Sequence, residues 1–151
     1  MTYTREQVVD VAKSMVGVPF RHQGRSRETG VDCVGLLAVI LSELGDEPHE
    51  FREYGTRPDP DDLLRHASIG MIPIPEHEAK PGDVLLFWLV RNKETHEPMP
   101  QHFAVLTDRN TIIHAMRRHG EVAEHGITDY WIRHRHAAYR FRGLIDNGVA
   151  P

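Results

Sequence analysis

The chain has 151 residues, of which 40% are hydrophobic and 26% are charged, as is usual for a soluble globular protein. This length can bury a core without disulfides or a metal, and we expect a single domain over residues 1–151. The formal net charge of −4 at pH 7 gives no basic surface, so we expect no nucleic-acid partner.

Two helices are expected in the first third of the chain. Thr4 and Gln7 form a capping-box pattern ahead of apolar residues at helical spacing, and Gly17 ends that run. After a charged, loop-like segment, Asp32 is a plausible N-cap for a second helix over residues 33–44. This second helix is apolar on nearly all sides, which is typical of a helix buried at the centre of a fold.

The remainder of the chain is expected to consist mainly of strands. Residues 46–82 are acidic and proline-rich, with one short helix expected in the sixties, and residues 91–101 indicate a polar loop. A further short helix is expected near residues 128–134. Apolar and β-branched runs predict strands over residues 84–90, 102–106, 111–115 and 138–143. Together these elements indicate an α+β fold, with helices on one side of an antiparallel sheet.

Cys33 is the only cysteine in the chain, so it cannot form an internal disulfide. It lies where a helix is expected to begin. There, backbone N–H groups and the positive end of the helix dipole stabilise a thiolate relative to a thiol. The alternative is an ordinary packing role, because free cysteine is among the most buried residue types.

Two histidines are candidates for the groups that a thiol nucleophile needs, a base and a third residue that holds the base. If residues 108–110 form the hairpin loop, His102 and His114 are diagonal neighbours on one face, about 7–8 Å apart at the backbone. A two-residue loop would place them on opposite faces. The expected roles are His102 as base and His114 as the group that fixes its tautomer, with a thiolate–imidazolium pair at Cys33 and His102. Taken alone, each histidine could equally be an ordinary surface or half-buried residue.

Five segments resemble the NlpC-type family of papain-like cysteine peptidases: residues 17–24, 32–36, 80–83, 102–105 and 112–115. The amino-acid sequences of these segments most resemble those of the branch carried by tailed phages and gene transfer agents. The resemblance implies a papain-like fold in which a central helix bearing the cysteine packs on an antiparallel sheet. It also implies Cys33 as nucleophile, His102 as base and His114 as the third polar residue.

One departure from the family pattern is at Phe20, where many members carry a tyrosine whose hydroxyl is associated with the oxyanion site. The candidates for oxyanion or substrate contacts are therefore Asp32, Phe20, His22 and Gln23. Of these, Asp32 is more readily explained as a helix cap.

The resemblance implies an endopeptidase or amidase that cleaves peptidoglycan stem peptides without a cofactor. It would be carried in a phage or gene transfer agent tail, with tail-tip or baseplate proteins as partners, to open the cell wall during DNA delivery. Two alternatives remain open. One is a catalytically weak or silent structural component of a tail tip, and the other is a thioesterase or acyltransferase on the same scaffold.

Residues 1–7 contain no apolar stretch that could form a signal peptide, and no apolar run approaches the roughly 20 residues that cross a bilayer. We therefore expect a chain made in the cytoplasm, without membrane insertion, that reaches the cell wall as part of a virion tail. A single free cysteine is consistent with a reducing compartment.

Four histidines near the C-terminal end suggest a zinc site as a further possibility: His119, His125, His134 and His136. However, the chain has no His-Glu-x-x-His pattern and no paired cysteines. The sequence therefore predicts no metal site.

Overall fold

The computed structural model describes residues 1–56 and 58–146. Its helices are α1 (Arg5–Ser14), α2 (Cys33–Glu43), α3 (Pro60–Gly70) and α4 (Asp129–Arg133), with the 3-10 turns η1 (Glu76–Glu78) and η2 (Arg117–His119). Its strands are β1 (Tyr3–Thr4), β2 (Arg25–Ser26), β3 (Gly30–Val31), β4 (Met71–Ile74), β5 (Val84–Arg91), β6 (Pro98–Leu106), β7 (Thr111–Ala115), β8 (Val122–Gly126), β9 (Arg135–Phe141) and β10 (Leu144–Ile145). Among the helices so described, none combines the length and the apolar character needed to span a membrane.

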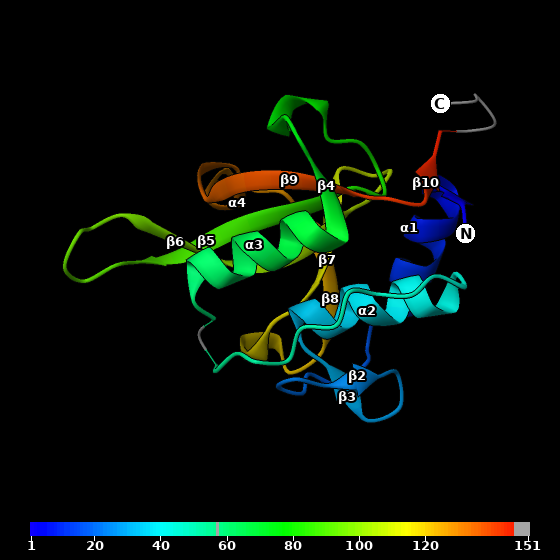
Figure 1. The fold of residues 1–151 in the computed structure, drawn as a ribbon, viewed down its shortest axis with the longest axis horizontal. Helices are drawn as coiled ribbons and strands as arrows, with labels where there is room; N and C mark the ends of the chain where they lie inside the picture. The colour runs from blue at the N-terminus through cyan, green and yellow to red at the C-terminus, as the bar shows by residue number, and fades with distance from the viewer. Residues whose placement is uncertain (57, 147–151) are drawn as a thin grey trace.

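A six-stranded sheet in the order β4-β9-β5-β6-β7-β8 forms the centre of the described structure (Figure 1). Its neighbouring strands pair antiparallel. Strands β1 and β10 form a separate parallel pair that brings the two ends of the described chain together. This mixture of helices and an antiparallel sheet confirms the expected α+β fold.

The caps that the sequence predicts are present at the first two helices. The Thr4 hydroxyl accepts a hydrogen bond from the Gln7 backbone, and the Gln7 side chain accepts one from the Thr4 backbone. The Asp32 carboxylate accepts a hydrogen bond from the Gly35 backbone N–H at 2.8 Å. Helix α2 therefore begins at Cys33, as expected.

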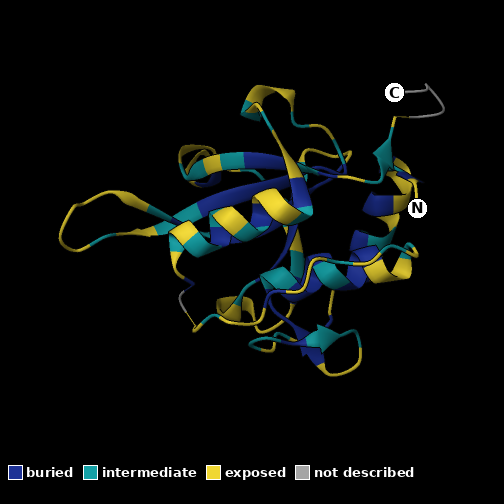
Figure 2. Ribbon diagram, viewed as in Figure 1, coloured by how far each residue is buried: buried dark blue, intermediate teal, exposed yellow. Residues whose placement is uncertain are grey.

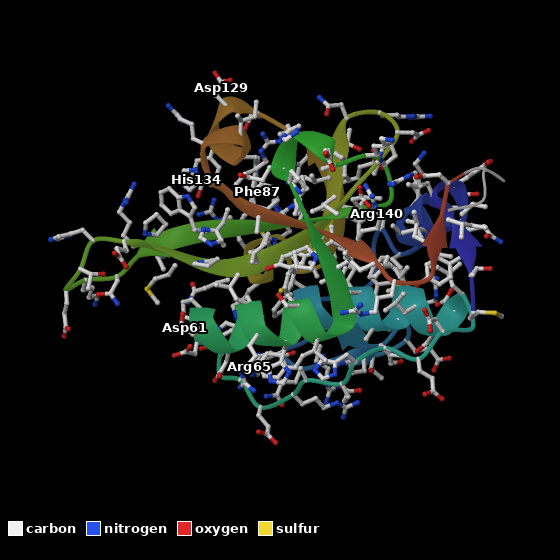
Figure 3. The ribbon with its side chains drawn as sticks, turned by 45° about the horizontal axis from the view of Figure 1, so that its top comes forward. Asp61, Arg65, Phe87, Asp129, His134 and Arg140 are labelled. Atoms are coloured by element: carbon white, nitrogen blue, oxygen red, sulfur yellow. The ribbon has the colours of Figure 1, made fainter. Side chains whose placement is uncertain are left out.

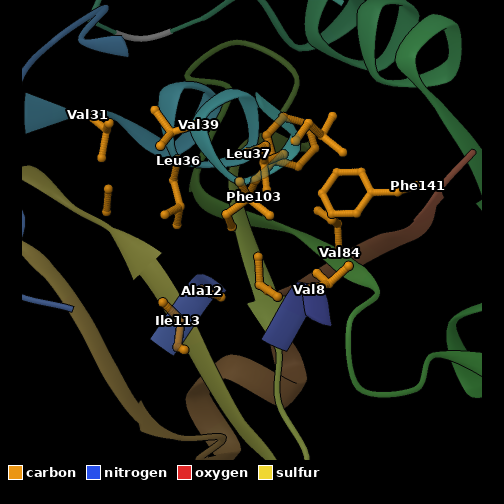
Figure 4. Packing of buried hydrophobic residues seen from close by; sticks show 14 of the residues in the cluster. Val8, Ala12, Val31, Leu36, Leu37, Val39, Val84, Phe103, Ile113 and Phe141 are labelled. Atoms are coloured by element: carbon orange, nitrogen blue, oxygen red, sulfur yellow. The ribbon is translucent and has the colours of Figure 1, made fainter. Parts of the chain in front are cut away.

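The larger part of the core lies between the helices and one face of the sheet. Figure 4 shows Val8 of α1 and Leu36 of α2 beside Phe103 of β6 and Ile113 of β7, and all four side chains are buried. Figure 2 shows that α3 buries one side and exposes the other. The apolar character of α2 thus reflects its position at the centre of this layer.

A second apolar cluster covers the opposite face of the sheet. It contains Phe87 of β5, Ala104 of β6 and Ile112 of β7, together with Trp131 of α4. The ring centroids of Phe87 and Trp131 lie 4.9 Å apart, in an edge-on arrangement. The expectation that the helices occupy only one side of the sheet is therefore wrong for α4.

The sheet also contains strand residues that the sequence analysis did not predict. Strand β6 begins at Pro98, inside the expected polar loop, and pairs with β5 to form a long hairpin (Figure 1). Strands β4 and β8 were not predicted, and they are the two outermost strands of the sheet. Edge strands are short and tolerate proline and charge, so they carry a weaker apolar pattern than central strands.

Candidate active site

The β6–β7 hairpin has the register that the sequence predicts. Val105 pairs with Ile113, and the backbone N–H of Thr107 donates to the carbonyl of Thr111 at 2.9 Å. The loop is therefore formed by residues 108–110. Side chains at positions 102 and 114 consequently share one face of the sheet.

The two histidines on this face are in direct contact. His102 Nε2 lies 2.6 Å from His114 Nδ1, and their ring planes are inclined at 69°. Both side chains are buried, and both pack near Trp131 of the second apolar cluster. Each histidine thus has a partner and an enclosed environment, as a base and its positioning group would need.

Cys33 and His102 line the same pocket, which has a volume of about 350 Å³. Cys33 is the first residue of α2, which covers one face of the sheet, and His102 extends from the other face. Strand β7 ends at Ala115, so position 102 of β6 has no β7 residue paired with it. The thiol and the imidazole reach a common pocket where the pairing of these two strands has ended.

The surroundings of Cys33 favour a neutral thiol in the free protein. Burial raises the pKa of the Cys33 thiol to about 12, and the negative charge of Asp32 acts in the same direction. Hydrogen bonds from the backbones of Phe103 and Val34, and the charge of Arg25, lower this pKa but do not offset the burial. The stabilisation that a helix start gives to a thiolate is therefore outweighed here.

The two imidazoles are also held neutral. Burial lowers the pKa of His102 to about 3 and that of His114 to about 2, and neighbouring histidines contribute further to both shifts. A neutral thiol beside a neutral imidazole is thus favoured at pH 7. The expected preformed thiolate–imidazolium pair is not the form that this environment stabilises.

We expect iodoacetamide to alkylate Cys33 more slowly than free cysteine at about pH 7, with a rate that rises steadily towards about pH 10. The thiolate is the reactive species, and a raised pKa makes the thiolate rarer at every pH below it. Mass spectrometry of samples quenched over time measures the rate, and Cys33→Ala, which has no other thiol, is the control. A constant rate between about pH 6 and pH 8 would instead indicate a preformed ion pair.

His125 of β8 extends the histidine pair into a chain of three imidazoles. His114 Nε2 lies 2.6 Å from His125 Nε2, and His125 Nδ1 lies 3.0 Å from the carbonyl oxygen of Gly126. A carbonyl only accepts, so His125 Nδ1 carries a proton and donates it. With neutral rings, His114 then donates from Nε2 to His125, and His102 donates from Nε2 to His114. This order leaves His102 Nδ1 unprotonated, which is the state that a general base requires.

Asp32 connects several segments beside the pocket. Besides the Gly35 N–H, its carboxylate accepts hydrogen bonds from the Gln23 backbone at 2.8 Å and the Tyr54 hydroxyl at 2.5 Å. It also forms an ion pair with Arg25 at 3.2 Å. These contacts agree with the cap role, whereas a carboxylate engaged by four donors has no proton to offer an oxyanion.

Phe20 and His22 both line the pocket, as expected of residues that contact substrate. Phe20 provides a ring face without a donor, and the guanidinium of Arg117 lies 5.3 Å from the centre of that ring. His22 packs edge-on against Tyr54, with ring centroids 5.6 Å apart. The structure therefore places an imidazole, and no tyrosine hydroxyl from position 20, on this side of the pocket.

Gln23 differs from the other candidates because it does not line the pocket. Its side-chain amide donates to the carbonyls of Arg52 and Tyr54, each at 2.7 Å, and so fixes a neighbouring segment. Tyr54 lines the pocket and was missed by the sequence analysis. It lies in the stretch 46–79, which has no recognisable motif, and only the folded chain brings it beside Asp32.

A sequence model of the NlpC/P60 family matches residues 17–140, which is most of the chain. The chain belongs to the NlpC/P60 family. The match spans all three segments that carry Cys33, His102 and His114. No curated protein matches this NlpC/P60 chain.

Solved structures of NlpC/P60 proteins have the same fold. An NLP/P60 protein from Staphylococcus aureus, described as similar to a lipoprotein, is 24% identical, with a TM-score of 0.64 over 93% of this chain and 43% of its own. An NlpC/P60 protein from Bacillus cereus is 20% identical, with a TM-score of 0.68 over 93% and 41%. The NlpC/P60 domain of the peptidoglycan hydrolase SagA is 22% identical, with a TM-score of 0.59 over 91% and 98%.

This NlpC/P60 chain spans less than half the length of the Staphylococcus and Bacillus proteins, but nearly all of the SagA domain. The shared part is thus the NlpC/P60 domain itself. At these identities, the comparison establishes the papain-like α+β fold that the sequence resemblance implied.

Proposed function

We propose that this protein is a cysteine peptidase that cleaves peptidoglycan stem peptides, as an endopeptidase or amidase. The observation that carries the proposal is the common pocket of Cys33 and His102, with His114 in contact with His102. Membership of the NlpC/P60 family and the fold shared with the peptidoglycan hydrolase SagA support the substrate class.

In the proposed reaction, His102 Nδ1 accepts the thiol proton as the sulfur of Cys33 attacks the scissile carbonyl carbon. Since the thiol is neutral beforehand, proton transfer and attack occur together. Backbone N–H groups at the start of α2 stabilise the tetrahedral oxyanion. His102 then gives the proton to the leaving amine, and the C–N bond breaks to leave a thioester. Water hydrolyses this thioester and regenerates the thiol.

The decisive experiment is mass spectrometry of purified peptidoglycan incubated with the wild-type protein and with Cys33→Ala. We expect new stem-peptide fragments only with the wild type, and their masses identify the cleaved bond. Cys33→Ala removes the nucleophile but keeps the Asp32 cap at the start of α2, so its thermal stability should stay close to wild type. Equal cleavage by the two proteins would refute the proposal.

We further propose that the protein acts at the cell wall as part of a phage or gene transfer agent tail, with tail-tip or baseplate proteins as partners. The support is that the amino-acid sequences around Cys33, His102 and His114 resemble those of the phage and gene transfer agent branch. Proteomics of purified particles tests this placement, since the chain should copurify with tail proteins.

A catalytically silent component of a tail tip is the second candidate function. The observation that favours it is Phe20 in the pocket wall, where many family members carry a tyrosine whose hydroxyl is associated with the oxyanion site. The same peptidoglycan digest separates the two candidates. An inactive wild-type protein that is nevertheless found in particles would support the silent role.

A further inference from the structure

Three histidines from different elements meet behind the pocket. They are His114 of β7, His119 of η2 and His125 of β8, and one nitrogen from each lies within 4.8 Å of the other two. His134 and His136, which the sequence places in the same group, are not part of this cluster. The cluster was not visible as a sequence motif because the hairpin of β7 and β8 and the turn η2 assemble it.

The chemistry of this cluster fits a zinc ion. Imidazole nitrogens bind Zn²⁺ at about 2.0–2.1 Å, and three of them with a water molecule complete a tetrahedral site. Two nitrogens bound at these distances to one tetrahedral ion lie about 3.3 Å apart, so the rings of His114 and His125, whose Nε2 atoms lie 2.6 Å apart, have to separate when an ion enters. His114 is fully buried, His125 is half-buried and His119 is exposed, so the cluster reaches solvent at η2, where an ion and a water ligand can enter.

The hydrogen bonds around the cluster also suit metal ligands. A histidine that binds a metal typically donates its second ring N–H to a carbonyl or another acceptor. His125 Nδ1 donates to the carbonyl of Gly126, so its Nε2 lone pair points to His114 and is available to an ion. His114 Nδ1 lies 2.6 Å from His102 Nε2, so once its Nε2 binds an ion, His114 can donate from Nδ1 to that nitrogen.

We propose that His114, His119 and His125 bind Zn²⁺, and that the bound ion switches off the thiol at Cys33. The first half concerns binding alone. The second half rests on the proposed function, because it assumes that His102 takes the proton of Cys33.

The inhibition follows from the order of protons along the imidazole chain. Without metal, His114 donates from Nε2, and His102 Nδ1 is unprotonated. To bind an ion, His114 Nε2 must give up its proton and offer its lone pair, so the single proton of the neutral ring lies on Nδ1 and is donated to His102 Nε2. His102 then carries its own proton on Nδ1 and cannot accept another from the thiol. Zinc binding thus removes the base without touching Cys33.

Isothermal titration with ZnCl2 tests the binding. It is done on the Cys33→Ser protein, so that the thiolate of Cys33 cannot bind the ion. We expect one ion per chain, and at least tenfold weaker binding after His119→Gln or His125→Gln. His77→Gln is the matched control, because His77 is an exposed histidine on η1, outside the cluster. Zinc binding that is unchanged in both cluster variants would overturn the site. If the wild type binds zinc but Cys33→Ser does not, the ion is bound by the thiol instead.

Peptidoglycan cleavage by the wild type, with ZnCl2 or with a chelator, tests the switch. We expect zinc to inhibit cleavage and His119→Gln to need at least tenfold more zinc for the same inhibition, while His77→Gln behaves as wild type. Equal inhibition of His119→Gln and wild type would overturn the switch. If the wild type does not cleave peptidoglycan even with chelator, the proposed function and the switch both fail, and the titration still decides whether the zinc site exists.

Discussion

Replacing His102 with alanine is expected to lower kcat/KM for stem-peptide cleavage by about 10³-fold or more. General-base catalysis contributes about 10²–10⁴-fold in enzymes, and here the base acts on a thiol that burial keeps neutral. Among the described residues that line the pocket, His102 alone belongs to the imidazole chain, so its loss removes the unprotonated nitrogen that would accept the thiol proton. Steady-state kinetics on a purified muropeptide measures the loss.

His114→Gln is the informative companion variant, because it keeps a polar side chain behind His102 but interrupts the chain to His125. A smaller loss in kcat than for His102→Ala is expected, since the base remains and only its tautomer is less well fixed. His77→Ala, on an exposed residue, should leave the kinetics unchanged. Wild-type rates for His102→Ala, with the fold intact by circular dichroism, would exclude His102 as the base.

The largest effect on stability is expected at Asp83. Its fully buried carboxylate forms ion pairs with Arg5 at 3.1 Å and Arg140 at 2.8 Å, and Figure 3 labels Arg140 on β9. It also accepts a hydrogen bond from the Lys80 backbone at 2.9 Å. Removing one partner of a buried ion pair leaves the other charge uncompensated, at a cost of about 3–5 kcal/mol. Asp83→Ala should therefore lower the free energy of unfolding by about that amount.

Urea denaturation followed by circular dichroism measures this difference. The matched control is Arg65→Ala, which removes the ion pair with Asp62 on α3 (Arg65 is labelled in Figure 3). Both side chains of that pair are at least half exposed, so the expected loss is below about 1 kcal/mol. If both variants lost similar stability, the buried pair at Asp83 would not have the importance assigned to it.

Local patterns were sufficient for the elements that present the candidate site. One residue, Asp32, and the apolar run that follows it are enough to predict the helix cap. The cap makes Cys33 the first residue of α2. The hairpin loop at residues 108–110 is similarly local, and the period of two along a strand then decides that His102 and His114 share a face. Such features depend on neighbours in the chain, so a single sequence carries them.

Other features depend on contacts between distant segments. Tyr54 reaches the pocket only because Asp32 and Gln23 hold its segment there, and no local pattern signals that contact. His125 meets His114 across the β7–β8 pair, and β8 is an edge strand with a weak apolar pattern. The apolar surroundings that raise the pKa of the Cys33 thiol likewise arise from packing between distant segments, which the helix start does not reveal.

The carboxylate of Asp32 has a consequence for how a substrate would bind. It joins the first turn of α2 to Tyr54, which lines the pocket, and to the backbone of Gln23, which lies outside it, so the thiol and one part of the pocket wall are fixed to one another. These segments become ordered when the chain folds, so the protein loses little further conformational entropy when a substrate binds. A peptide would thus meet a preformed surface, and its affinity would depend chiefly on its own flexibility.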